Sequence, residues 1–326
     1  MKIKDFGGEF KLIDRLAAIA SQTHGDLVAG IGDDAAVIRT APDPAPYLLV
    51  TTDLLVEGSH FSNQWCGPEA IGRKAVACNA SDIAAMGGRP TWMFVSLVLT
   101  PQTEVAWVEA LYRGMSLTCR SHGIVLAGGD TTHGPNVSLS ITLLGSVPRS
   151  SLCLRSQAQP GDVIMVTGTL GASAAALALL EKGHDPGGYL LDKHCSPGCR
   201  LDISDTIAPL ANAMIDISDG LGSEVRHICR QSGVGAEIAA ECIPLHSEVL
   251  HAAAVLDADP VNFALEGGED YELLFTLSPE GAEVLEKRTA DCRRIGVVTH
   301  GPGEPVLVLP GGARRPMPGG YNHFGD

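Results

Sequence analysis

Short segments that combine glycine with acidic side chains recur along the whole chain, and they constrain its fold more than any other feature. In the first, GIGDDAAV at residues 30–37, two glycines precede the adjacent acids Asp33 and Asp34. The later segments carry Asp53, Asp82, Asp130, Asp216 with Asp219, and Glu269 with Asp270. A single Asp–Gly pair usually marks a turn. The recurrence of the whole set predicts that the fold brings these carboxylates together around metal ions that carry phosphates.

Carboxylates gathered in this way could not all stay ionised without a cation. Two of them about 4 Å apart repel by roughly 4 kcal/mol at an effective dielectric constant near 20. Carboxylate and hydroxyl oxygens select hard cations, chiefly Mg²⁺, which usually bridges protein carboxylates to substrate phosphates. No cysteine or serine nucleophile motif accompanies the acids. The set therefore indicates direct in-line phosphoryl transfer, which depends on positioning and charge neutralisation.

The charge and hydropathy of the chain exclude several classes of partner. There are 38 acidic and 23 basic side chains, for a formal net charge of −15. Binding to a nucleic-acid backbone needs Lys and Arg, so we expect no nucleic acid and no anionic membrane surface as partner. The chain has no stretch of 18 consecutive apolar residues, so we expect no transmembrane helix. Its first residues lack the apolar core of a signal peptide.

The cysteines are consistent with a cytoplasmic protein. There are nine, an odd number, scattered between Cys66 and Cys292. This pattern fits reduced thiols better than a disulfide framework. Cys195 and Cys199 form the only tight group, and because no second ligand pair follows at zinc spacing we expect a structural loop there.

A length of 326 residues predicts two domains. Residues 148–160 resemble a connection, so we place the domains at 1–148 and 149–326. We expect an α+β chain of two α/β domains, each an open sheet with helices on one side. Predicted helices span residues 9–20, 68–86, 103–121 and 170–182, with another after Gly220. Predicted strands span 47–50, 92–99, 124–127, 137–147, 161–167, 271–277, 293–299 and 304–309.

Three details of this reading bear on function. We expect Thr51–Asp53 and Gly128–Thr132 to follow the ends of their strands, and residues 183–198 to be rich in loops. The glycine turn at residues 168–171 is not a P-loop, because no Lys-Ser/Thr pair follows it. On the helix at 68–86, Lys74, Asn79 and Asp82 share one flank, which is either the wall of a polar site or a solvated face.

The motifs resemble those of a known family. In order they are GIGDDAAV, TTDLLVEGSHF, KAVACNASDIAAMGG, GGDTT, DISDGL and GGEDYEL. This ordered set resembles the thiamine-monophosphate kinases of the aminoimidazole ribonucleotide synthetase-like superfamily, and the likeness covers nearly the whole chain. The resemblance implies ATP-dependent phosphorylation of thiamine monophosphate to thiamine diphosphate with several Mg²⁺ ions. It also implies a homodimer joined through the sheets of the N-terminal domains, which would carry the metal and ATP sites.

The resemblance also implies roles for individual residues. The implied metal ligands are Asp34, Thr51, Thr52, Asp53, Asp82, Asp130, Asp216 and Asp219. The implied ATP contacts are Tyr112, Gly129, Arg155 and Ser218, and the implied thiamine phosphate contacts are His60, Glu269 and Tyr321. We expect Asp53 and Asp130 to act at the reacting phosphates. Helical geometry alone adds Lys74 to them as a group that neutralises phosphate charge.

Two departures and two alternatives stay open. Residues 194–200 lack the prolines that the family often has there, and Asn322 stands where Asp is common. Another synthetase of the superfamily is one alternative. However, the first cysteine is Cys66, no cysteine ends the chain, and aminoimidazole ribonucleotide synthetase does not match GGEDYEL. The other alternative is a non-catalytic Mg-nucleotide-binding protein, against which the retention of every acidic motif argues.

Overall fold

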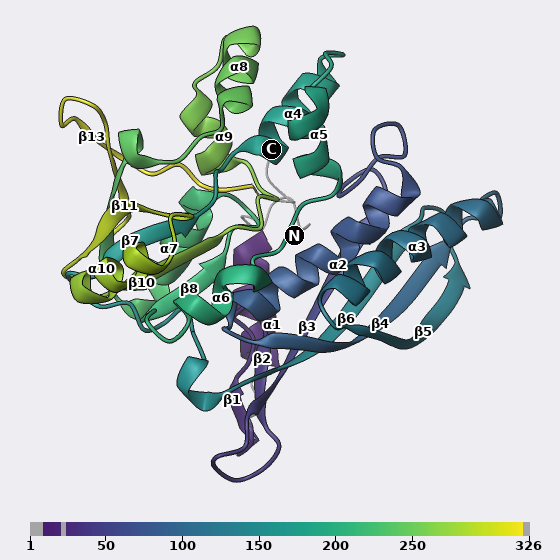
Figure 1. The fold of residues 1–326 in the computed structure, drawn as a ribbon, viewed down its shortest axis with the longest axis horizontal. Helices are drawn as coiled ribbons and strands as arrows, with labels where there is room; N and C mark the ends of the chain where they lie inside the picture. Colours follow the sequence, from purple (N-terminus) through teal and green to yellow (C-terminus); the bar gives the residue numbers. More distant parts are fainter. Residues whose placement is uncertain (1–8, 21–23, 322–326) are drawn as a thin grey trace.

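The computed structural model describes residues 9–20 and 24–321, and its strands form two sheets (Figure 1). The first sheet has the order β1 (Leu27–Ala29), β2 (Ala36–Arg39), β3 (Tyr47–Val56), β6 (Ser138–Val147), β4 (Arg89–Leu99), β5 (Val125–His133). Only β4 and β5 pair in parallel, and the helix α3 (Val105–Ser121) connects them. Helices α2 (Pro68–Ala85) and α3 cover one face of this sheet (Figure 1).

The two faces of the first sheet differ sharply in exposure. Along β4, Met93, Val95 and Leu97 are buried in the core beneath α2 and α3. The alternate residues Trp92 and Phe94 are 50% and 41% exposed, because successive side chains of a strand point to opposite faces. The exposed face of this sheet therefore carries large apolar side chains.

The second sheet has seven strands and lies in the other half of the molecule. Its order is β13 (Arg314–Pro316), β12 (Val306–Val308), β9 (Gly235–Ala239), β11 (Cys292–Thr299), β7 (Val163–Thr167), β10 (Leu273–Leu277), β8 (Ala213–Asp216). The helices of this half are α4 (Ala172–Glu181), α5 (Gly187–Cys195), α6 (Leu201–Ile207), α7 (Leu221–Ser232), α8 (Ser247–Leu256), α9 (Pro260–Glu266) and α10 (Pro279–Arg288). Among the described residues, no helix is long and apolar enough to cross a membrane.

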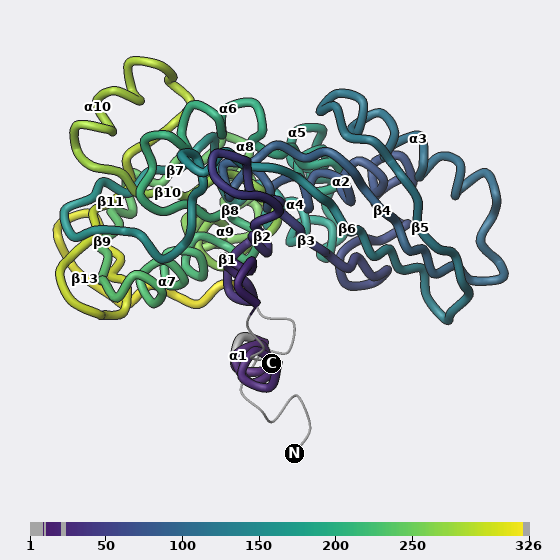
Figure 2. Tube along the Cα trace, turned by 90° about the horizontal axis from the view of Figure 1, so that it is seen from below, coloured from purple at the N-terminus to yellow at the C-terminus, as the bar shows by residue number. Residues whose placement is uncertain are grey.

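Helix α2 joins the two halves. Pro68 occupies its first turn, where the missing N–H has no helical partner. Its last residues, Ala84 and Ala85, belong to the core of the second half together with Met165 and Met214. Gly87 follows with a φ of +71°, and a Cβ there would lie 2.1 Å from the Ser151 carbonyl oxygen, so only glycine fits. Helix α1 (Glu9–Ile19) lies apart from both sheets (Figure 2).

The structure confirms two α/β halves and corrects several local predictions. Strand β3 runs to Val56 and β5 to His133, so both polar motifs lie inside strands and not beyond their ends. Asp and Gly are depleted in strands, but here the pairing with neighbouring strands continues through them. The loop expected at 183–198 contains α5, where Leu190 and His194 are buried one helical turn apart. The domain boundary after residue 148 stays a prediction.

The prediction that the cysteines are reduced is wrong for one pair. Cys66, in the loop before α2, forms a disulfide with Cys195 at the end of α5, 129 residues away. Both side chains are buried at the junction of the two halves. The other seven cysteines are free thiols, and six of them are buried. The two partners share no local motif, so spacing along the sequence could not pair them.

Candidate active site

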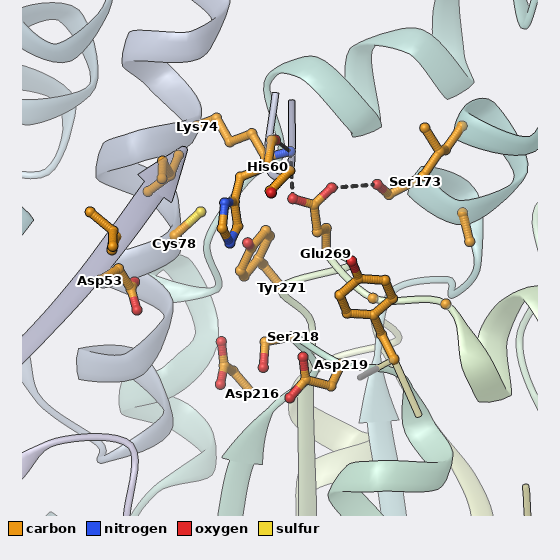
Figure 3. A pocket seen from close by; sticks show the side chains of 18 of the residues that line it. Asp53, His60, Lys74, Cys78, Ser173, Asp216, Ser218, Asp219, Glu269 and Tyr271 are labelled. Atoms are coloured by element: carbon orange, nitrogen blue, oxygen red, sulfur yellow. Dashed lines mark hydrogen bonds and ion pairs between the residues drawn. The ribbon is translucent and has the colours of Figure 1, made fainter. Parts of the chain in front are cut away.

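A cavity of about 360 Å³ is lined by residues from both halves of the molecule (Figure 3). The first half contributes residues of β3, the loop after it and α2, among them Asp53, His60, Lys74, Cys78 and Asp82. The second half contributes α4, the loop after β8 and the loop before β10. Acidic groups lie toward one side of the cavity, and the contacts between Lys74 and Glu269 lie toward another (Figure 3).

Three carboxylates meet at the acidic side. Asp34, Asp82 and Asp216 each offer one oxygen, and these oxygens lie within 4.8 Å of one another. They come from the loop before β2, from α2 and from the end of β8, so the cluster joins both halves. The Thr51 hydroxyl donates to Asp82, and Ser81 Oγ donates to Asp216 Oδ2 at 2.6 Å. Helix α2 therefore forms the wall of a polar site and not a solvated face.

The cluster has the properties of a site for a hard cation. Asp34 Oδ2 is buried and has no hydrogen-bond partner. Desolvation and the charges of Asp53 and Asp216 hold the pKa of Asp82 well above its ordinary value. Desolvation and the charge of Asp34 raise the pKa of Asp216 to about 8. Since all donors are oxygens, the residues present fit Mg²⁺, which would remove the repulsion between them.

The glycine-rich segment at 30–34 is attached to the second half of the chain. Arg155 forms an ion pair with Asp34, and its backbone N–H donates to Asp33 Oδ1 at 3.0 Å. The Gly32 carbonyl accepts a hydrogen bond of 2.6 Å from Gln231 Nε2 on α7. Asp33 therefore shapes the turn, while Asp34 faces the other carboxylates. Arg155 contacts the cluster through Asp34.

The opposite side of the cavity holds a paired lysine and glutamate. Lys74 Nζ lies 2.6 Å from Glu269 Oε1 and donates to the His60 carbonyl oxygen at 2.9 Å. Desolvation acts to raise the pKa of Glu269, but Lys74 and His194 outweigh it, and the pKa lies below its ordinary value. Desolvation, with the charge of Lys74, lowers the pKa of His194 to about 4. At neutral pH Glu269 is therefore ionised and His194 is uncharged.

Most of the residues predicted from the sequence lie together. Those that line the cavity are Asp53, His60, Lys74, Asp82, Asp216, Ser218, Asp219, Glu269 and Tyr321. Asp34 and Thr51 join them through the carboxylate cluster. Asp53 lies on the same strand face as Thr51, and desolvation raises its pKa to about 6.

Four predicted residues lie elsewhere in the single chain. Thr52 points to the exposed face of the first sheet, where its hydroxyl donates to the Ile141 carbonyl. Gly129 and Asp130 lie on the edge strand β5, which β6 and β4 separate from β3. Tyr112 lines a different surface hollow on α3, with Arg113 and Leu126.

Several residues that line the cavity were not predicted from the sequence, among them Cys78, Ser173 and Tyr271. Cys78 lies four residues from both Lys74 and Asp82, so helical spacing alone would have placed it on their flank. Tyr271 is part of the GGEDYEL motif. Ser173 stands in an alanine-rich helix and gave no signal.

The chain is similar to proteins of one family along nearly its whole length. The family described as AIR synthase related protein, N-terminal domain, matches residues 32–147, and its C-terminal domain counterpart matches residues 159–308. Thiamine-monophosphate kinase of Aquifex aeolicus is 37% identical over 328 residues, covering 99% of this chain and all of the relative. The Bacillus subtilis enzyme is 35% identical, covering 95% of this chain and 98% of the relative.

The chain is also similar to solved structures over nearly its whole length. The chain superposes on a structure titled "AaThiL complexed with AMPPCP and TMP" with a TM-score of 0.87 and 35% identity, covering 99% of both chains. Thiamine-monophosphate kinase from Stenotrophomonas maltophilia gives a TM-score of 0.75 at 36% identity, covering 93% of this chain and 96% of that one. Hydrogenase maturation protein HypE in complex with ATP, at 19% identity, shares the fold.

Proposed function

Because this chain belongs to the thiamine-monophosphate kinase family, we infer that it phosphorylates thiamine monophosphate to thiamine diphosphate with ATP. The observation that carries this inference is the composite cavity, which has a cluster of three carboxylates from both halves on one side and a paired lysine and glutamate on another. A relative with 35% identity was solved with AMPPCP and TMP, which supports the same pair of substrates. The transfer is a direct in-line one between two bound phosphates.

The residues of the cavity divide the work of this reaction. Asp34, Asp82 and Asp216 would hold Mg²⁺, with Asp53 and Asp219 beside them, and the metal would neutralise the charge of the phosphates. Glu269 is ionised and can face the cationic thiazolium ring of the substrate. Leu55 and Leu177 give the cavity apolar surface for the rest of the ring system. His60 and Tyr321 line the cavity from opposite halves and would complete the substrate contacts.

The test is formation of thiamine diphosphate by the purified protein. Product should require ATP, thiamine monophosphate and Mg²⁺ together. Asp53→Ala should abolish turnover without unfolding the protein, because it removes an oxygen ligand from the metal site. Binding of ATP in a calorimeter without turnover of thiamine monophosphate would show a non-catalytic nucleotide-binding protein. If Asp53→Ala kept near-normal activity, Asp53 would not be a ligand of the metal site.

A homodimer joined through the first sheet is the second part of the proposal. The exposed face of that sheet carries Trp92 and Phe94, and a second copy is the partner that the family resemblance implies. Thr52 lies on the same face, and Asp130 pairs in register with Ser96, next to Phe94 on β4. A second copy would therefore cover Thr52 and Asp130, two of the predicted ligands that lie outside the cavity. Light scattering should give twice the chain mass, and Phe94→Lys should give monomers.

The proposed location is the cytoplasm, where ATP is available as co-substrate. The disulfide between Cys66 and Cys195 is unusual for that compartment. Trapping of free thiols in intact cells, followed by mass spectrometry, would report whether this pair is oxidised there.

A further inference from the structure

We propose that Lys74 is a positioning residue, which fixes Glu269 and His60 relative to each other across the two halves of the molecule. This inference rests on the proposed function, because it assigns a role in binding thiamine monophosphate. Lys74 stands on α2 with a side chain only 1% exposed. Its ammonium group contacts one residue of the loop before β10 and one of the loop after β3.

The charge of Lys74 is already balanced inside the protein. Removing an ammonium group from water costs several kcal/mol unless an anion and hydrogen-bond acceptors replace the water. Glu269 Oε1 at 2.6 Å supplies the anion, and the His60 carbonyl at 2.9 Å supplies a second acceptor. The pair is neutral as a whole. The lysine therefore acts by holding Glu269 and His60 in place. The positive charge that neutralises the phosphates has to come from other groups.

Glu269 is held from several sides, so its carboxylate has one orientation. Its backbone has a φ of +65°, a conformation that costs energy for a residue other than glycine. Its N–H donates to the Ser218 carbonyl at 2.7 Å, which ties it to the loop after β8. Its second carboxylate oxygen, Oε2, accepts a hydrogen bond of 3.2 Å from Ser173 on α4 (Figure 3). Lys74 fixes the remaining oxygen.

His60 is held in the same way. Its Nδ1 accepts a hydrogen bond of 3.0 Å from the Val56 N–H, so in the neutral ring the proton is on Nε2. Its carbonyl oxygen accepts from Lys74. One ammonium group therefore sets the distance between the histidine loop of the first half and the glutamate loop of the second half. Both loops contribute to the wall of the same cavity.

A double-mutant cycle separates this role from direct contact with phosphate. The variants are Lys74→Met, Glu269→Gln and the two together. The dissociation constant for thiamine monophosphate is measured by calorimetry without ATP, and KM and kcat are measured with ATP. We expect each single variant to weaken binding about 10–100-fold, because it leaves the other member of a buried pair without its partner. The double variant should bind no more weakly than the weaker single variant, with kcat at saturating substrate changed much less than KM.

Thermal unfolding supplies a readout that does not depend on activity. The double variant should melt at a higher temperature than Lys74→Met, since it carries no unpaired buried charge. Lys193→Met is the matched control, because Lys193 also faces a buried glutamate, Glu272 at 3.7 Å, but does not line the cavity. It should leave binding of thiamine monophosphate unchanged.

Two results would overturn the proposal. One is a double variant whose loss of binding equals the product of the two single losses. The other is a Lys74→Met variant with lower kcat and unchanged affinity for thiamine monophosphate, which would show a direct role at the phosphates. If wild-type protein binds thiamine monophosphate but forms no thiamine diphosphate, the proposed function fails while the cycle still tests the role of Lys74.

Discussion

Replacing Asp82 with asparagine should stabilise the metal-free protein while it removes the activity. The oxygens of Asp34, Asp82 and Asp216 lie within 4.8 Å of one another. At an effective dielectric constant near 20, each ionised pair at that distance repels by about 3.5 kcal/mol. Asparagine removes the pairs that involve Asp82 and keeps an oxygen to accept from Thr51. Protonation and the ion pair of Arg155 with Asp34 already relieve part of the repulsion. We therefore expect a net gain of about 1–3 kcal/mol at pH 8.

The sign of this effect follows from the pKa of Asp82, which lies well above 3.8 in the folded protein. Folding takes up protons, so the penalty that Asp82 imposes is absent near pH 3 and grows as the pH rises through the folded pKa. The advantage of Asp82→Asn over the wild type should grow in the same direction.

Scanning calorimetry with EDTA at pH 5 and pH 8 measures this difference, and a coupled ATPase assay measures activity. Asp162→Asn is the control. Asp162 is also buried, but it accepts hydrogen bonds from Asn212 and from the Gln159 N–H, so asparagine should destabilise the protein at both pH values. The reasoning is refuted if metal-free Asp82→Asn is less stable than wild type at pH 8. It is also refuted if Mg²⁺ raises the melting temperature of the variant as much as that of the wild type.

Three further predictions concern the metal, the disulfide and the glutamate loop. Mg²⁺ should raise the melting temperature more at pH 8 than at pH 5.5, because it competes with protons for Asp53 and Asp216. The pKa values of these two groups are raised to about 6 and about 8. An equal rise in melting temperature at both pH values would argue against these ligands. Cys66→Ser should cost up to about 5 kcal/mol in urea unfolding, because the disulfide closes a loop of 129 residues, whereas Cys242→Ser, at an exposed free thiol, should not. Gly268→Ala should weaken binding of thiamine monophosphate at least about tenfold, because a Cβ would lie 2.2 Å from the Ser218 carbonyl oxygen and displace the Glu269 loop. The control is Gly303→Ala, which has open space around it and should bind thiamine monophosphate like wild type.

The convergence of three acids could be predicted because each stands in a motif with glycine or small neighbours, although the same reasoning included Asp130, which lies on the edge strand β5. Asp34, Asp82 and Asp216 come from distant segments, yet all three reach one point. The error at Thr51–Asp53 was one of element length. Once β3 is extended to Val56, the strand alternation puts Thr51 and Asp53 on one face and Thr52 on the other.

Other features had no local signal in the sequence. The pairing of Cys66 with Cys195 depends on how α5 lies against the loop before α2, which is a tertiary property. The contact of Ser173 with Glu269 depends on the packing of α4 beside the cavity. Lys74 was placed correctly on the flank of α2 by periodicity, but its partner could not be known before the two halves were brought together. Local patterns therefore predicted which residues matter better than what they contact.

The division of the carboxylate cluster between the two halves has a thermodynamic consequence. Asp34 and Asp82 belong to one half and Asp216 to the other, so the full set of ligands exists only while the halves keep this arrangement. By linkage, the binding free energy that a cation gains from the third carboxylate also stabilises the contact between the halves. Any change that loosens this contact therefore lowers the affinity for the cation by the same factor. A substitution of Ala85, which packs in the core of the second half and is not itself a ligand, should therefore appear first as a higher requirement for Mg²⁺.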